Sequence, residues 1–206
     1  ALIKSAKLVA TMKHAADYGL KNAQIDFDFA EVMERVQRVV REVEPHDSVE
    51  RYTALGVECI TGTARITSPW TVEIADDAGT RTVTTRGIII AAGARPFVPS
   101  IPGIEETGYL TSDTVWSLRA LPKRLVVLGG GPIGCELTQC FARLGAEVTQ
   151  VEMLPRIMMR EDPEISEMVL QKFRSEGITV LLNHKALRCA VENGEKVLYC
   201  EAGGNT

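Results

Sequence analysis

A glycine-rich turn between an apolar run and an amphipathic segment constrains the fold of this chain more than any other feature. The apolar run covers 125–128, and Gly129, Gly131 and Gly134 follow it in the spacing G-x-G-x-x-G. The next segment, 132–144, has the pattern of a helix. The spacing alone is weak evidence, but between a strand and a helix it is typical of a dinucleotide-binding turn.

Each residue of the turn has a chemical role in this prediction. Gly129 permits the tight turn, Gly131 lets the backbone approach a pyrophosphate, and Gly134 lets the helix pack closely on the strand. The first N–H groups of the helix and its dipole then attract the phosphates. Pro132 is tolerated at the first helical position, because its missing N–H would have no intrahelical partner. The alternative is a glycine-rich turn that holds no ligand.

An acidic residue follows at the distance expected for ribose recognition. Glu152 ends a second predicted strand, 147–152, about 20 residues after the glycines. A carboxylate in this position accepts hydrogen bonds from the ribose hydroxyls and repels a 2′-phosphate, so it favours NAD. Arg156 is a candidate partner for such a phosphate, which leaves NADP open.

Strands and helices alternate through the remainder of this half of the chain. A helix is predicted for 162–177 and a third strand for 178–183, followed by a hairpin around Asn193 and Gly194. This alternation is typical of a parallel sheet with right-handed crossovers. The fold class is therefore predicted to be α/β.

The first half of the chain has a different organisation. Helices are predicted for 2–17 and 29–55, and Pro45 is where the second one kinks or divides. β-Branched runs then predict a small meander that leads into a buried strand at 87–91. We place a domain boundary between residues 118 and 119.

Composition excludes several classes of partner. The net charge of −4 gives no electrostatic support for a nucleic-acid partner. No apolar run approaches the roughly 20 residues that span a bilayer, and the N-terminus has no signal-peptide layout. The five cysteines form no CxxC pair, which argues against a disulfide scaffold and against a zinc site. We expect a cytoplasmic protein with reduced thiols and no metal site.

Cys135 and Cys140 have the spacing of a C-x4-C redox motif, but we reject that interpretation. Both fall in the helix predicted after the glycine turn, five residues and so about 140° apart. A disulfide needs converging side chains. We predict two buried, inert thiols, and the same for Cys59, Cys189 and Cys200.

Four segments together resemble a known enzyme family. They read "GIIIAAGARPFVPSIPGI", "TSDTVWSL", "LPKRLVVLGGGPIGCEL" and "EVTQVEMLPRIMMRED". In order and spacing the chain resembles the FAD-dependent pyridine nucleotide–disulfide oxidoreductases, which include dihydrolipoamide dehydrogenase and mercuric reductase. The resemblance implies two Rossmann-like domains, both incomplete, with the β-meander as an insert: a partial FAD-binding domain in 1–118 and a partial NAD-binding domain in 119–206.

The resemblance also implies which residues contact the two cofactors. Ile133 would lie near the nicotinamide, Ala186 would line the adenine pocket of NAD, and Glu136 would be a catalytic glutamate close to the flavin. The turn residues that would hold the NAD pyrophosphate are Gly129, Gly130, Gly131, Pro132, Ile133 and Gly134. The residues that would contact FAD are Ala64, at its adenine end, and Ala92, Gly93 and Ala94; the family usually has threonine where Ala92 stands.

The implied reaction passes hydride from NAD(P)H through FAD to a disulfide, as in dihydrolipoamide dehydrogenase, or to a metal ion, as in mercuric reductase. Alternatives are a non-disulfide NADH oxidase or diaphorase and an inactive nucleotide-binding fragment. In the family, a helix like the one beginning "ALIKSAK" follows the redox cysteines, and a C-terminal domain supplies a His–Glu pair and the homodimer contacts. His14, His46 and His184 do not match that pair and are expected at the surface, so we expect the 206-residue chain alone to lack reductase activity.

Overall fold

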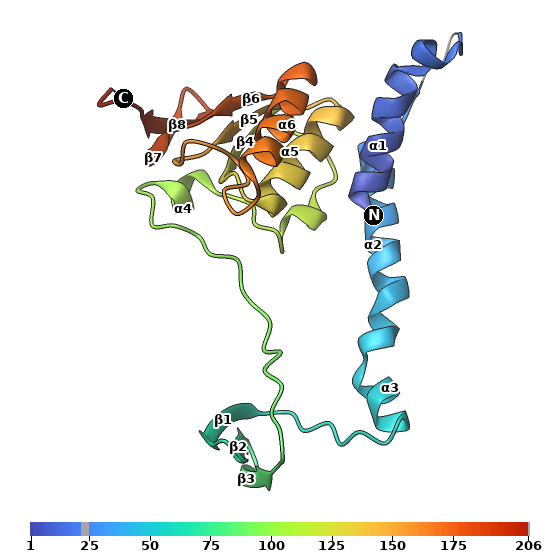
Figure 1. Ribbon diagram of the computed structural model, residues 1–206, viewed down its shortest axis with the longest axis vertical. Coiled ribbons are helices and arrows are strands. Elements are labelled where there is room, and N and C mark those ends of the chain that lie inside the picture. The colour runs from blue at the N-terminus through green and yellow to red at the C-terminus, as the bar shows by residue number, and fades with distance from the viewer. Residues whose placement is uncertain (22–24, 206) are drawn as a thin grey trace. The chain divides into compact units, whose positions relative to one another are not determined.

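The structure, a computed structural model, describes residues 1–21 and 25–205, and these fall into two compact units (Figure 1). One unit combines the residues up to Val39 with those from Pro96 onward, and the other covers Val40–Arg95. The larger unit contains the glycine turn. The chain is an α/β protein, as predicted, and it combines helices with both parallel and antiparallel strands.

A parallel three-stranded sheet forms the centre of the larger unit, with strand order β4-β5-β6. The strands and the helices that connect them are β4 (Arg124–Leu128), α5 (Pro132–Leu144), β5 (Glu147–Val151), α6 (Pro163–Ser175) and β6 (Thr179–Leu181). This alternation confirms the predicted strand–helix order. Because all three strands run in the same direction, their carboxyl ends meet at one edge of the sheet, where the glycine turn lies.

Two N-terminal helices pack onto α5. They are α1 (Leu2–Lys13) and the first part of α2 (Phe29–Val43). The rings of Phe29 and Phe141 lie 6.0 Å apart between centroids, and Leu2, Ala6 and Leu144 are buried in the same cluster. The compact units therefore do not divide at residues 118 and 119, because the apolar faces of these helices are buried against the parallel-sheet unit. The assignment of 1–118 to an FAD-binding domain stays a prediction.

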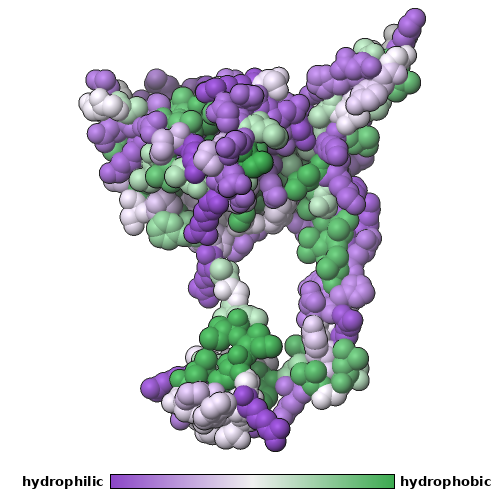
Figure 2. All heavy atoms as spheres, viewed as in Figure 1, coloured by the Kyte–Doolittle hydropathy of each residue, from purple (hydrophilic) through white to green (hydrophobic). Residues whose placement is uncertain are grey.

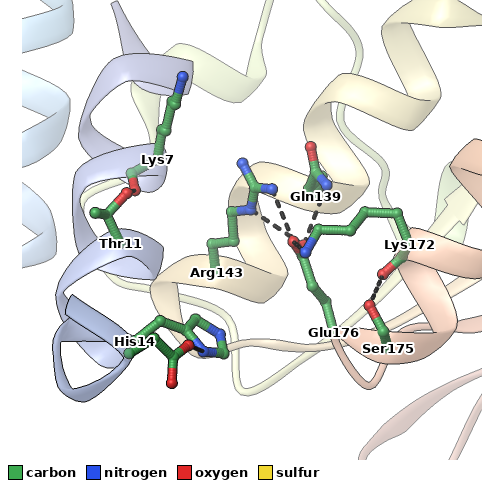
Figure 3. Close-up of polar contacts among 9 residues, drawn as sticks. Lys7, Thr11, His14, Gln139, Arg143, Lys172, Ser175 and Glu176 are labelled. Carbon is green, nitrogen blue, oxygen red and sulfur yellow. Dashed lines mark hydrogen bonds and ion pairs between the residues drawn. The ribbon is translucent and has the colours of Figure 1, made fainter.

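A polar cluster ties the end of α5 to the end of α6 (Figure 3). Arg143 donates from Nη2 and Nε to the two oxygens of Glu176 at 2.7 and 3.1 Å, and Gln139 donates to the same carboxylate at 3.1 Å. Lys172 adds an ion pair at 3.2 Å. Burial acts to raise the pKa of Glu176, but the hydrogen bonds from Arg143 and Lys172 outweigh it and the pKa is lowered.

The hairpin predicted around Asn193 and Gly194 is confirmed. Strand β7 (Lys185–Glu192) pairs antiparallel with β8 (Glu195–Glu201). Asn193 and Gly194 have φ of 53° and 80°, the left-handed pair that a two-residue turn requires. Shorter helices in the larger unit are η1 (Ala15–Tyr18), α4 (Ile104–Thr107) and η3 (Val115–Ser117).

The smaller unit contains the predicted meander. Its strands β1 (Thr63–Ser68), β2 (Thr71–Asp76) and β3 (Gly79–Thr84) pair antiparallel in sequence order. The predicted helix 29–55 is divided: α2 ends at Val43, a 3-10 turn η2 (Glu44–Asp47) contains Pro45, and α3 covers Val49–Ala54. The break follows from Pro45, which cannot donate the helical hydrogen bond.

The prediction of a buried strand at 87–91 is wrong. The segment has no strand hydrogen bonds, and Ile89 and Ile90 are 94% and 76% exposed. A strand requires a neighbour to complete its ladder, and no strand in 1–21 or 25–205 pairs with this segment. Figure 2 shows hydrophobic side chains on the surface around this unit, in which no described residue is fully buried.

Two smaller predictions are also corrected. Cys59 is exposed and lies outside the strands, because the meander begins only at Thr63. His184 is half-buried rather than a surface residue, because its Nδ1 lies 2.7 Å from the carbonyl oxygen of Leu182. His14 and His46 are exposed, as expected.

Candidate functional site

The glycine turn lies where β4 ends and α5 begins. The N–H of Gly129 donates to the carbonyl of Val151 at 2.8 Å, which continues the pairing of β4 with β5. Gly129 has φ of 98°, a conformation that other residues rarely adopt. The chain then turns into α5, whose first residue is Pro132. The predicted junction of strand, turn and helix is therefore present.

Gly134 and Gly131 differ in their surroundings. A Cβ on Gly134 would lie 2.4 Å from the carbonyl oxygen of Gly129, so only glycine allows this approach of helix to strand end. A Cβ on Gly131 would meet nothing within 4 Å. Packing within the protein therefore explains the glycine at 134 but not the one at 131, where the space beside the backbone is open.

The start of α5 has unused hydrogen-bond donors. The first backbone hydrogen bond of the helix runs from the N–H of Cys135 to the carbonyl of Gly131 at 2.9 Å. The N–H groups of Ile133 and Gly134 precede it in the first turn, where helix geometry supplies no partner. No acidic side chain occupies that turn. These donors and the positive end of the helix dipole suit an anion.

Glu152 lies at the end of β5 and turns its carboxylate toward the glycine turn. The side chain is only 8% exposed. Its Oε2 accepts from the N–H of Gly130 at 2.5 Å, and its Oε1 accepts from the N–H of Leu154 at 2.7 Å. A Cβ on Gly130 would lie 3.0 Å from Oε2, so the missing side chain there makes room for this carboxylate. Glu152 thus holds the turn through the N–H of Gly130.

The loop between β5 and α6 contacts the glycine turn. Ile157 is fully buried, and the N–H of Met158 donates to the carbonyl of Gly130 at 2.7 Å. Arg156 donates to the carbonyls of Glu161 and Met159 at 3.2 and 3.3 Å. It also donates to the Oγ of Ser166 in α6 at 3.4 Å, so the guanidinium of Arg156 is engaged by its own loop and by the helix that follows.

A buried glutamine stands behind the turn, and the sequence analysis missed it. Gln150 has no exposed surface, and its Nε2 donates to the carbonyl of Gly129 at 2.9 Å and to the sulfur of Cys135 at 3.5 Å. The available signal was an amide side chain between Thr149 and Val151 in a strand predicted for the parallel sheet. Gln150 holds the carbonyl of Gly129 and so helps to fix the turn.

Cys135 and Cys140 are free and buried, as predicted. They belong to different core clusters: Cys140 packs with Phe141 and α1, whereas Cys135 packs with Ile157 and α6. Burial raises the pKa of both thiols, that of Cys140 to about 11. Both side chains are therefore structural.

The remaining predicted cofactor residues are found in separate places. Ile133 is 60% exposed at the start of α5, Glu136 is exposed one turn further, and Ala186 is half-buried in β7. The residues assigned to FAD are all exposed, with one in β1 and three in an irregular segment: Ala64, Ala92, Gly93 and Ala94. The structure thus brings together the turn and Glu152, and the cofactor role of every one of these residues stays a prediction.

The described residues contain neither a metal-binding cluster nor a membrane-spanning helix. In the part of the chain that is described, no group of three or more His, Cys, Asp or Glu side chains is placed to hold a metal ion. The helices described are also too short or too polar for any of them to cross a bilayer.

Comparisons with known proteins agree on one family. The family profile for pyridine nucleotide-disulphide oxidoreductases matches residues 7–205. The chain is 33% identical over 98% of its length to a dihydrolipoyl dehydrogenase of Mycoplasma pneumoniae. It is 41% identical over 75% of its length to a mercuric reductase of Streptomyces lividans.

Solved structures give the same result. The Cu(II) complex of the HOCl-induced flavoprotein disulfide reductase RclA from Escherichia coli matches 97% of the chain with a TM-score of 0.73 and 25% identity. The chain covers 42% of that structure, 44% of the dihydrolipoyl dehydrogenase and 33% of the mercuric reductase. The chain therefore spans less than half the length of these relatives.

Proposed function

Because the chain belongs to the pyridine nucleotide-disulphide oxidoreductase family, we propose that its glycine turn binds the pyrophosphate of a nicotinamide dinucleotide. The observation that supports this most is the open space beside Gly131, where a Cβ would meet no atom within 4 Å. The adjacent N–H groups of Ile133 and Gly134 would donate to phosphate oxygens, and the helix dipole adds attraction. Ile133, exposed beside them, would face the nicotinamide, and Ala186 the adenine.

The preferred dinucleotide is NAD. Glu152 lies beside the turn, where its charge would repel a 2′-phosphate and its oxygens would accept from ribose hydroxyls. Both of its oxygens already accept a backbone N–H, so a ribose hydroxyl would use the remaining lone pairs of the carboxylate. Arg156, which is the candidate for binding a 2′-phosphate, is bonded within its own loop. NADP would require Arg156 to leave these carbonyls.

The proposed activity of the whole protein is oxidoreduction between NAD(P)H and a disulfide or a metal ion through FAD. The nicotinamide supplies the hydride and the flavin relays it to the acceptor. The chain's own residues would hold the dinucleotide at the turn, while Glu136 would lie close to the flavin. Ala64 and the segment 92–94 would contact FAD.

The names of the relatives suggest two candidate electron acceptors. A dihydrolipoyl group is the first candidate, because it would go with NAD, the dinucleotide that Glu152 favours. A mercuric ion is the second candidate, because it would normally go with NADPH. A cytoplasmic location and a homodimeric parent protein belong to the same proposal. A protein without a disulfide, of the NADH oxidase or diaphorase type, is the alternative within the enzymes.

Titration of the chain with NADH and NADPH tests the proposal. We expect NADH to bind more tightly, and Glu152→Ala to weaken NADH far more than NADPH. Because Glu152 also holds Gly130, the unfolding midpoint of the variant has to be measured in parallel, and binding compared well below it. Equal loss of the two nucleotides in a folded variant would remove the ribose role. No binding of either nucleotide by the wild-type chain would leave a glycine turn that serves packing alone.

A further inference from the structure

Two side chains at the end of β5 hold the same peptide unit of the glycine turn, one at each end. The Nε2 of Gln150 donates to the carbonyl of Gly129 at 2.9 Å, and the N–H of Gly130 donates to Oε2 of Glu152 at 2.5 Å. This carbonyl and this N–H belong to the peptide that joins Gly129 to Gly130. Side chains alternate along a strand, so residues 150 and 152 project to the same side. Gln150 and Glu152 therefore clamp one peptide between them.

The next peptide of the turn is held by its carbonyl. The carbonyl of Gly130 accepts from the N–H of Met158 at 2.7 Å and from the thiol of Cys135 at 3.4 Å. In a trans peptide the C=O and the N–H point in opposite directions. The N–H of Gly131 therefore points away from Met158 and Cys135. Gly131 is exposed, and a Cβ on it would meet no atom within 4 Å, so this N–H lies at the open start of α5.

The sequence makes such a clamp necessary, because residues 129–131 are three consecutive glycines. Glycine lacks the side chain that restricts the rotation of other backbone segments. Hydrogen bonds to fixed groups must supply the order that steric contacts supply elsewhere. Without the donor of Gln150, the first peptide is held at one end only. The N–H groups that follow it then lose their fixed arrangement.

The amide of Gln150 is not explained by packing alone. The side chain has no exposed surface, and its Oε1 has no hydrogen-bond partner among the described residues. A buried polar atom without a partner destabilises the folded state. An apolar side chain of similar size would avoid this penalty, but it could not donate to the carbonyl of Gly129. The contact with the turn is therefore what the buried amide provides.

We propose that Gln150 is a positioning residue: it orients the Gly129–Gly130 peptide so that the N–H groups at the start of α5 meet a pyrophosphate in one fixed arrangement. This inference rests on the proposed binding of a nicotinamide dinucleotide at the turn. Because Gln150 is fully buried, it acts through the carbonyl of Gly129 and does not touch the ligand. Donors that are already ordered bind more tightly, since less order has to be gained on binding.

Amide hydrogen exchange tests the clamp without any ligand. Gln150→Met keeps a side chain of similar length and removes the amide. In wild type the N–H of Gly130 is buried and bonded to Glu152. In the variant we expect it to exchange about tenfold faster, because the peptide is held at one end only. The N–H of Cys135, which is bonded within α5, should keep its exchange rate.

Titration with NADH tests the consequence for binding. Gln150→Met should bind NADH about tenfold more weakly, while its midpoint of urea unfolding stays within about 0.5 M of wild type. Thr138→Val is the matched control, because Thr138 is also fully buried in α5 and its Oγ1 has no partner in the described part of the chain. This change removes a buried polar atom and leaves the clamp intact. Its NADH affinity and its exchange at Gly130 should equal those of wild type.

The possible outcomes separate this proposal from the proposed function. An unchanged exchange rate at Gly130, or an unchanged NADH affinity in Gln150→Met, would overturn the positioning role, and so would an equal loss of affinity in Thr138→Val. Gln150→Leu is a second variant, and loss of folded structure in both, seen by circular dichroism, would show that the amide serves the fold instead. If the wild-type chain binds no dinucleotide, the proposed function fails, and exchange at Gly130 still decides whether Gln150 orders the turn.

Discussion

The two glycines at the start of α5 can be separated by experiment, because one is required by packing and the other is not. A Cβ on Gly134 would lie 2.4 Å from the carbonyl oxygen of Gly129, about 1 Å inside ordinary contact. The obstacle is backbone, so helix and strand end would have to move apart. Overpacking of this kind costs about 1–3 kcal/mol. Gly134→Ala should therefore lower the free energy of unfolding by that amount.

Gly131→Ala is the matched control. The new Cβ would meet nothing within 4 Å, and φ of −74° at this position is open to alanine. Its unfolding free energy should fall by no more than about 1 kcal/mol, which is the typical cost of alanine at a helix N-cap. The methyl group would, however, occupy the space proposed for the pyrophosphate, and NADH affinity should fall by at least about tenfold, or about 1.4 kcal/mol.

Urea unfolding followed by the fluorescence of Trp116 measures both variants. Trp116 packs against the core cluster that includes Phe141 of α5, and replacing Trp70 by phenylalanine removes the other source of tryptophan signal. A loss of about 2 kcal/mol corresponds to a midpoint lowered by about 1 M. The reasoning is refuted if Gly134→Ala is as stable as wild type, or if Gly131→Ala loses stability and keeps its affinity for NADH.

Three further predictions follow from individual contacts. Glu152→Gln should lower the free energy of unfolding in urea by about 1–3 kcal/mol, because its single carbonyl oxygen cannot replace both carboxylate acceptors; an unchanged midpoint would contradict this. The pKa of Glu176 is lowered, so the stabilisation from its ionised carboxylate is present above the ordinary value of 4.5 and is lost as pH falls below it. The free energy of unfolding of Glu176→Gln should therefore fall less than that of wild type as the pH is lowered below 4.5. Parallel curves of unfolding free energy against pH for the two proteins would refute the assignment. At pH 8 a thiol reagent should label the exposed Cys59 rapidly and Cys140, whose pKa is raised to about 11, only after unfolding; equal labelling rates would contradict its burial.

Local patterns predicted the parallel-sheet unit well. The glycine turn, the helix 132–144 and the hairpin at Asn193–Gly194 each depend on a glycine or a proline, whose range of backbone conformations differs from that of other residues. Glycine reaches positive φ, and proline fixes its own φ and cannot donate. Such constraints act within a few residues, so the sequence alone reveals them.

Several contacts between distant segments were not predicted. The segment 87–91 has the composition of a buried strand, yet burial depends on a neighbouring strand that no local pattern specifies. The packing of α1 and α2 on α5 likewise depends on complementary apolar faces, and it groups 1–39 with the later unit. In the site, the use of Glu152 to hold Gly130 and of Gln150 to hold Gly129 required the three-dimensional structure, because the turn meets both side chains only after β4 and β5 pair.

The central claim is that backbone N–H groups at the start of α5 bind the pyrophosphate of NADH. Amide chemical shifts of the ¹⁵N-labelled chain, recorded during titration with NADH, test it directly. We expect the largest shifts at Gly131, Ile133 and Gly134, and we expect inorganic pyrophosphate to move the same signals. Saturable shifts confined to other segments, with these three amides unmoved, would contradict it.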